Sequence, residues 1–146
     1  MLTLNNKNIM LENQEKWKRI IIHCSATKPS QKVTVKDIDA WHKARGMKEI
    51  GYHFVVDTEG RIHVGRAITS IGAHCFGYNR SSIGICYIGG LNEEGLPADT
   101  RTPKQKAALH HLVKQMMRAF SIQKVIGHNE VSDKACPCFN VQEEFA

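Results

Sequence analysis

Two histidines and a cysteine carry the strongest chemical signal in this chain. His23 closes an apolar run of three isoleucines, His128 follows a second short apolar segment, and Cys136 comes soon after it. Two imidazoles and a thiolate are enough for a catalytic zinc site whose fourth position stays open for water. Lys134 would add a positive charge where a hydrolytic transition state builds negative charge. Together these residues predict a metal-dependent hydrolase with one zinc ion per chain.

The elements that must position these residues alternate between strands and helices. Each of the two predicted helices opens with a capping sequence, at Thr34 and at Thr102, and continues with apolar residues at helical spacing. Buried or alternating apolar runs predict five strands, at 17–23, 52–56, 61–65, 82–88 and 124–126. This alternation predicts an α/β fold, a single domain with a central mixed β-sheet flanked by helices.

The two histidines each follow the C-terminal end of a predicted buried strand. Functional sites in such sheets gather at the carboxyl edge, so His23 and His128 could meet there despite their separation in sequence. Cys136 has three interpretations: a metal ligand, a buried structural thiol, or a nucleophile paired with a histidine. Cys138 could offer its sulfur instead. We expect only one of the two to face the site and favour Cys136.

Composition limits the classes of protein. The 146 residues suit one domain, and the net charge of +6 favours a polyanionic partner. The basic residues are scattered without an aromatic stripe, so we expect no specific nucleic acid partner. No signal peptide or membrane-length apolar run is visible, which predicts a protein that is cytoplasmic as synthesised and does not insert into membranes. We expect it to be a monomer. The odd count of five cysteines predicts reduced thiols.

The first residues differ from the rest of the chain. Residues 1–16 are polar and lack periodicity, which predicts a flexible N-terminal arm. The strands, the helices and the candidate ligands all lie beyond it.

The chain resembles the zinc-dependent N-acetylmuramoyl-L-alanine amidases of the peptidoglycan-recognition, or amidase type 2, family. The matching stretches occur in the family's order and span residues 17–141, at 22–30, 41–42, 51–54, 72–74, 77–79, 82–84 and 128–137. The resemblance implies a central mixed sheet flanked by helices, with a zinc-bearing groove on one face. Residues 17–146 are accordingly predicted to form a zinc amidase domain.

The resemblance also implies a ligand set for the metal. His23 and His128 fall on the family's two histidine ligands, and Cys136 falls on its thiolate ligand. One departure is Cys138, which stands where a small hydroxyl residue is expected. Because it supplies a second sulfur next to the ligand, it leaves open which sulfur binds the metal.

Four more residues receive roles from the resemblance. Tyr52 and Lys134 fall on the family's two catalytic side chains, while His74 and Asn79 fall in the loop that lines the peptidoglycan groove. In the predicted mechanism zinc activates a water, Tyr52 orients that water or helps remove its proton, and Lys134 stabilises the oxyanion.

The predicted activity is hydrolysis of the amide between N-acetylmuramic acid and L-alanine, with peptidoglycan or muropeptides as substrate. An endolysin-like role would require release to the cell wall by a holin or by lysis. Two alternatives remain: a non-catalytic peptidoglycan receptor, and a Cys–His peptidase. The receptor is disfavoured because receptors of this family typically lose the sulfur ligand, which this chain keeps as Cys136.

Overall fold

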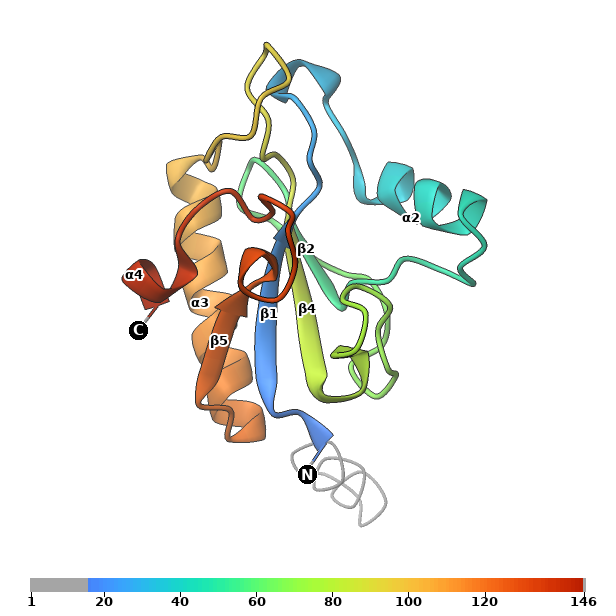
Figure 1. Cartoon of the computed structure of the whole chain (residues 1–146), viewed down its shortest axis with the longest axis vertical. Coiled ribbons are helices and arrows are strands. Elements are labelled where there is room, and N and C mark those ends of the chain that lie inside the picture. Colours follow the sequence, from blue (N-terminus) through green and yellow to red (C-terminus); the bar gives the residue numbers. More distant parts are fainter. Residues whose placement is uncertain (1–15, 146) are drawn as a thin grey trace.

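A five-stranded mixed sheet organises the computed structural model, which describes residues 16–145 (Figure 1). Four strands run parallel, and only β3 pairs antiparallel, with β2. The spatial order is β3-β2-β4-β1-β5, and the bounds are β1 Arg19–Cys24, β2 Phe54–Val56, β3 Ile62–Val64, β4 Ser82–Tyr87 and β5 Lys124–Gly127. The predicted α/β architecture with a central mixed sheet is confirmed.

The central strand β1 sends alternate side chains to opposite faces of the sheet. Ile20, Ile22 and Cys24 join the main apolar core, which the long helix α3 (Pro103–Phe120) covers. Ile21 belongs to a separate small cluster on the other face, and His23 faces that way too. One strand therefore supplies both the core and the candidate site.

Helix α3 is fixed to the sheet by its cap as well as by its apolar face. Thr102 accepts a hydrogen bond from the Gln105 backbone N–H, and the Gln105 side chain accepts one from the Thr102 N–H, which completes the predicted capping box. The buried Gln105 amide also donates to the carbonyls of Val56 and Ile88. The helix start is thus tied to the ends of β2 and β4.

Helix α2 (Val35–Ala44) packs on the opposite face of the sheet. Its capping box is built by Thr34 and Asp37, so aspartate replaces glutamate here without loss of the reciprocal hydrogen bonds. Ile38 of this helix packs with Val55 and Cys86 of the sheet. Cys86 is fully buried in β4.

Several boundaries differ from the sequence-based expectation. The strand expected at 52–56 begins only at Phe54, because the Tyr52 carbonyl accepts from the Arg66 N–H in an irregular pairing ahead of β2. A C-terminal helix, α4 (Val141–Phe145), was not predicted, and neither were the single turns η1 (Pro29–Gln31), η2 (Asn79–Ser81) and η3 (His128–Glu130). Elements this short hold too few apolar residues to show a period.

The predicted N-terminal arm lies almost wholly outside the described residues. Within 16–145, no helix combines the length and the apolar character that crossing a membrane requires.

Candidate metal centre

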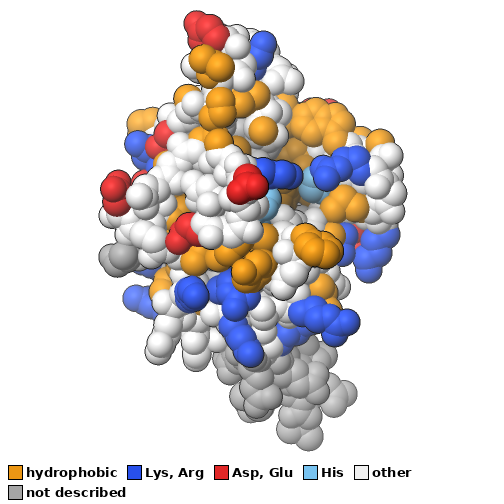
Figure 2. Space-filling model, viewed as in Figure 1, with side chains coloured by type: hydrophobic (Ala, Val, Ile, Leu, Met, Phe, Trp, Pro, Cys, Tyr) orange, Lys and Arg blue, Asp and Glu red, His pale blue; other side chains and the backbone are white. Residues whose placement is uncertain are grey.

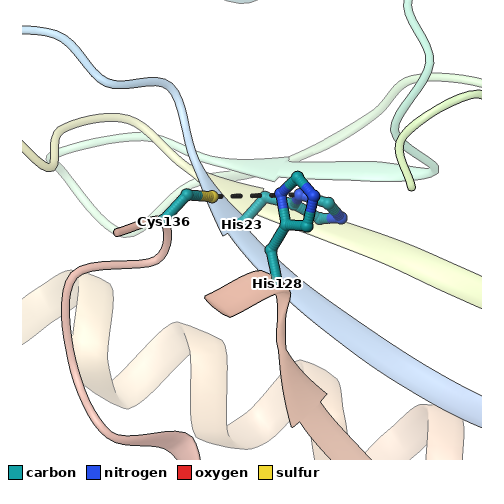
Figure 3. A group of neighbouring side chains, drawn as sticks. All are labelled: His23, His128 and Cys136. Atoms are coloured by element: carbon teal, nitrogen blue, oxygen red, sulfur yellow. Dashed lines mark hydrogen bonds between the residues drawn. The ribbon is translucent and has the colours of Figure 1, made fainter. Parts of the chain in front are cut away.

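The three predicted ligands come together at the carboxyl edge of the sheet (Figure 3). His23 lies on β1, His128 begins η3 directly after β5, and Cys136 lies on the loop that follows. Their ligand atoms all lie within 4.8 Å of one another. The parallel register explains the histidine pair, because Ile22 faces Gly127 across the two strands and the next residues are the two histidines. Their ring centroids are 4.7 Å apart.

A chain of hydrogen bonds orients the His23 ring. Its Nε2 lies 2.9 Å from His74 Nδ1, and His74 Nε2 lies 3.2 Å from the Ser82 carbonyl oxygen. Since a carbonyl can only accept, His74 donates from Nε2 and accepts from His23 through Nδ1. His23 therefore carries its proton on Nε2. Its unprotonated Nδ1 is left facing the Cys136 sulfur at 3.9 Å.

Burial keeps these imidazoles neutral, the form that binds metal. Desolvation is the main cause that lowers the pKa of His23 well below its ordinary value, and His74 adds to the effect. Burial also lowers the pKa of His74, to about 3. The pKa of His128 is lowered first by burial and then by the positive charge of Lys134.

The Cys136 sulfur is held by contacts that the sequence did not reveal. The Cys24 backbone N–H donates to Cys136 Sγ over 3.1 Å, a contact suited to a thiolate. The Tyr87 hydroxyl donates to the Pro137 carbonyl over 2.6 Å and so fixes the loop next to the ligand. Tyr87 and Cys24 look like ordinary strand residues in the sequence, so no pattern could have identified them as supports of the ligand loop.

The second sulfur of this loop lies elsewhere. Cys138 adopts a positive φ of 67° and its sulfur lies 3.9 Å from Cys24 Sγ, on the core side of β1. Among the described residues, the group of possible ligands contains Cys136 and not Cys138. The arrangement therefore favours Cys136 as the sulfur that faces the two histidines.

The donor set fits zinc. Zinc bonds of about 2.0–2.3 Å at tetrahedral angles place neighbouring ligand atoms about 3.5 Å apart. Ligand atoms already within 4.8 Å reach that spacing through small side-chain rotations. Among the described residues the group has three possible ligands, and three protein ligands with a fourth position for water are typical of a catalytic zinc site.

Tyr52 and Lys134 both lie next to this group. The Tyr52 ring is centred 5.1 Å from the His23 ring, and desolvation raises the pKa of the Tyr52 phenol well above its ordinary value, which keeps it protonated. Lys134 is exposed, yet its charge lowers the pKa values of His23 and His128. Both side chains therefore lie beside the three possible ligands, and their catalytic roles stay predictions.

The two predicted substrate-binding residues also have structural contacts. Both ring nitrogens of His74 make hydrogen bonds within the protein. Asn79 Oδ1 accepts from the backbone N–H groups of His74 and Cys75, each over 2.9 Å. Asn79 therefore fixes the loop, and His74 orients His23. A substrate contact by either residue stays a prediction.

Charged side chains of both signs lie on the surface around the centre (Figure 2). Figure 2 shows histidine side chains in a hollow near the middle of this face, with Lys and Arg side chains beside them. Two further histidines have structural partners: His42 Nδ1 accepts from the Gly51 N–H, and His53 bonds to Gly84 and Ser70. Neither of these two rings is available to a ligand through the nitrogens that make those bonds.

Comparisons with known proteins agree with this geometry. The sequence profile of the family described as N-acetylmuramoyl-L-alanine amidase matches residues 13–139. The endolysin of Escherichia phage T7 is 37% identical over 134 residues, which cover 92% of this chain and 89% of that protein. A peptidoglycan-recognition protein of Drosophila melanogaster is 31% identical over 130 residues, covering 86% of this chain and 70% of that protein.

A solved structure shares the fold. The N-acetylmuramoyl-L-alanine amidase LysC from Clostridium intestinale URNW superposes with a TM-score of 0.78 at 30% sequence identity, covering 90% of this chain and 83% of that one.

Proposed function

The chain belongs to the N-acetylmuramoyl-L-alanine amidase family and is a peptidoglycan amidase, and we propose that it works through a zinc ion held by His23, His128 and Cys136. The observation that carries the proposal is the convergence of these three ligand atoms within 4.8 Å, with His23 Nδ1 left unprotonated toward Cys136. The bond cleaved is the amide between N-acetylmuramic acid and the L-alanine of the stem peptide.

Zinc bound there would supply Lewis-acid activation of water and of the scissile carbonyl. The chain's own residues do the rest. Tyr52 stays protonated, so its hydroxyl donates a hydrogen bond that orients the reacting groups rather than acting as a base. The Lys134 ammonium stabilises the negative charge that develops on the carbonyl oxygen. A thiolate ligand reduces the net charge of the site, and Lys134 restores it.

The substrate proposal covers peptidoglycan and the muropeptides derived from it. The net charge of +6 and the Lys and Arg side chains beside the histidines suit a polymer with anionic groups. We further propose that the enzyme acts on the cell wall after release from the cell that makes it, as a monomer.

One alternative has a geometric basis. Cys136 Sγ lies 3.9 Å from His23 Nδ1, a spacing at which a thiol and an imidazole could form a nucleophile–base pair. A Cys–His peptidase would keep its activity in the presence of a metal chelator. The amidase would lose its activity to the chelator and regain it when zinc is added back.

Product analysis tests the bond that is cleaved. Digestion of purified peptidoglycan should release stem peptides with new N-terminal alanine and leave the glycan strands intact, which mass spectrometry detects. New reducing sugar ends as the main product would indicate a glycosidase and overturn the proposal.

Metal analysis tests the ligand set. Cys136→Ser should lose most of the zinc, whereas Cys138→Ser, a matched change two residues away, should keep about one zinc per chain. The opposite pattern would assign the sulfur ligand to Cys138. Both variants are checked by circular dichroism, so that loss of metal is separated from loss of fold.

A further inference from the structure

Two cysteines that the amidase chemistry does not use lie against each other beside the metal centre. Cys24 Sγ and Cys138 Sγ are 3.9 Å apart, although the residues are 114 positions apart in sequence. All five cysteines are free thiols, and Cys75 and Cys86 lie in other parts of the molecule. The fold therefore brings the thiols of Cys24 and Cys138 into contact, while the Cys136 sulfur lies against the Cys24 backbone on the metal side.

The pairing follows from how β1 and the ligand loop meet. His23 points to the metal side of β1, so its neighbour Cys24 points to the core side. On the loop, the Cys136 sulfur lies 3.9 Å from His23 Nδ1, whereas Cys138, which adopts a positive φ, has its sulfur against Cys24. Cys24 and Cys138 therefore meet beside the metal centre, next to the residues His23 and Cys136 that could bind the metal.

We propose that Cys24 and Cys138 form an intramolecular disulfide when the protein meets an oxidised low-molecular-weight disulfide such as oxidised glutathione. A disulfide requires a sulfur–sulfur bond of about 2.0 Å. Sulfurs already 3.9 Å apart approach that distance by rotating about their Cα–Cβ bonds. The site is a covalent modification site distinct from the metal ligands.

The exchange takes two steps and balances. The partly exposed Cys138 thiolate attacks the small disulfide, which forms a mixed disulfide and releases one small thiol. Cys24, only 4% exposed, then attacks the Cys138 sulfur and releases the second small thiol. Two protein thiols are oxidised, one small disulfide is reduced to two thiols, and no other reactant is needed.

The cross-link would tie the end of β1 to the loop that carries Cys136. A disulfide that closes a long loop restricts the unfolded chain and so favours the folded state. The span between the two residues is 114 positions, so the oxidised protein should melt about 5–15 °C higher than the reduced protein. Cys136 keeps its sulfur free, which leaves the ligand set intact.

The test uses the full chain. The purified protein is incubated with oxidised glutathione at about pH 8, near the ordinary pKa of a thiol. Free thiols are then alkylated under denaturing conditions, and the peptides are mapped by mass spectrometry. The expected result is one disulfide between Cys24 and Cys138, loss of two hydrogens in the intact mass, and alkylation of Cys75, Cys86 and Cys136. The melting temperature should rise and should return to its starting value after reduction.

Matched variants make the result decisive. Cys138→Ser should show no intramolecular disulfide and no rise in melting temperature, whereas Cys75→Ser should behave as the wild type. A linked peptide that contains Cys136, or a mixed disulfide at Cys138 that never resolves, would overturn the proposal. Since the readout is the thiol map, a protein that proved to lack zinc or amidase activity would leave this test valid.

Discussion

The two faces of the central sheet use the same strands for different purposes. Toward α3, β1 presents Ile20, Ile22 and Cys24 to an apolar core that needs only shape and hydrophobicity. Toward α2 and the loops, the same strand presents His23, whose two ring nitrogens each have a defined neighbour. The comparison shows how a strand can hold a reactive side chain accurately: packing on one face fixes the position of the strand, and so of the side chain on the other face.

The largest effect on activity is expected on the metal face, which is the face of the sheet that carries His23. His23→Ala should remove a ligand from the group of three, strip most of the zinc, and lower turnover by more than about 10³, beyond the loss of a single charge-stabilising donor. Zinc content and kcat on purified peptidoglycan measure it. The melting temperature should fall as well, because bound metal stabilises the folded state. A variant that retains stoichiometric zinc would show that His23 is not a ligand.

A substitution on the core face, which is the face covered by α3, should lower stability and leave turnover unchanged. Ile22 is fully buried one residue away, and Ile22→Ala should lower the free energy of unfolding by about 2–5 kcal/mol through lost packing. Turnover per folded, zinc-loaded molecule should stay within about twofold of the wild type, because Ile22 faces away from the ligands. Urea unfolding and single-turnover assays separate the two readouts. A large fall in turnover with the fold intact would mean that the two faces are not independent.

A substitution of Lys134 distinguishes a role in the reaction from a role in metal binding. It lies on an exposed part of the ligand loop and affects the histidines only through its charge. Lys134→Ala should keep zinc and substrate binding and lower kcat at least about tenfold, with losses near 10²–10³ if it contacts the oxyanion directly. Tyr52→Phe should behave in the same way. Full turnover by a zinc-loaded Lys134→Ala protein would show that Lys134 does not stabilise the oxyanion.

His74 should affect the metal rather than the reaction. Because it fixes the proton of His23 on Nε2, His74→Ala should weaken zinc affinity by about 10–100-fold while kcat at saturating zinc changes less. Competition with a chromophoric chelator measures the affinity. His111→Ala, on the exposed side of α3, serves as a control and should match the wild type. Unchanged zinc affinity would contradict a role of His74 in orienting His23 and would favour the predicted role in substrate binding.

The smallest effect is expected at an ion pair on the core face. Arg101 bonds to Glu144 over 2.7 Å, and this hydrogen bond holds the pKa of Glu144 below its ordinary value. A carboxyl with a lowered pKa in the folded state stabilises the protein above its unfolded-state pKa and loses that contribution as pH falls through the folded-state pKa. Glu144→Gln should cost about 1 kcal/mol at neutral pH.

The pH dependence provides the check for that pair. Wild-type stability should fall as the pH drops below about 4.5, the ordinary pKa of a glutamate, and the difference between wild type and Glu144→Gln should shrink over the same range. Thermal melts at several pH values measure both. A difference that stays constant down to about pH 2 would show that the charge of Glu144 does not contribute.

Much of the fold could be predicted from local patterns. The caps at Thr34 and Thr102 need only residues three positions apart, and the strands around Ile21 and Ile85 appear as continuous apolar runs. The start of β2 could not be predicted, because Tyr52 leaves the regular ladder to bond with Arg66 from a later loop. Helix α4 is held by the buried Val141 and by the contact between Arg101 and Glu144, and neither shows as a period in the sequence.

By itself, the sequence determined the set of chemical groups. His23, His128, Cys136, Tyr52 and Lys134 could be selected because residue type and position after a strand are local properties, and the family resemblance supplied their roles. Tertiary structure decided how those groups are held.

Only the packed chain shows that His74 fixes the His23 tautomer and that Cys138 turns away to meet Cys24. The physical reason is that these contacts join segments 51 and 114 positions apart in sequence. Hydrogen-bond partners and sulfur distances depend on where each loop lies against β1. That placement is set by the core on the far face of the sheet, through contacts that no single segment of the sequence contains.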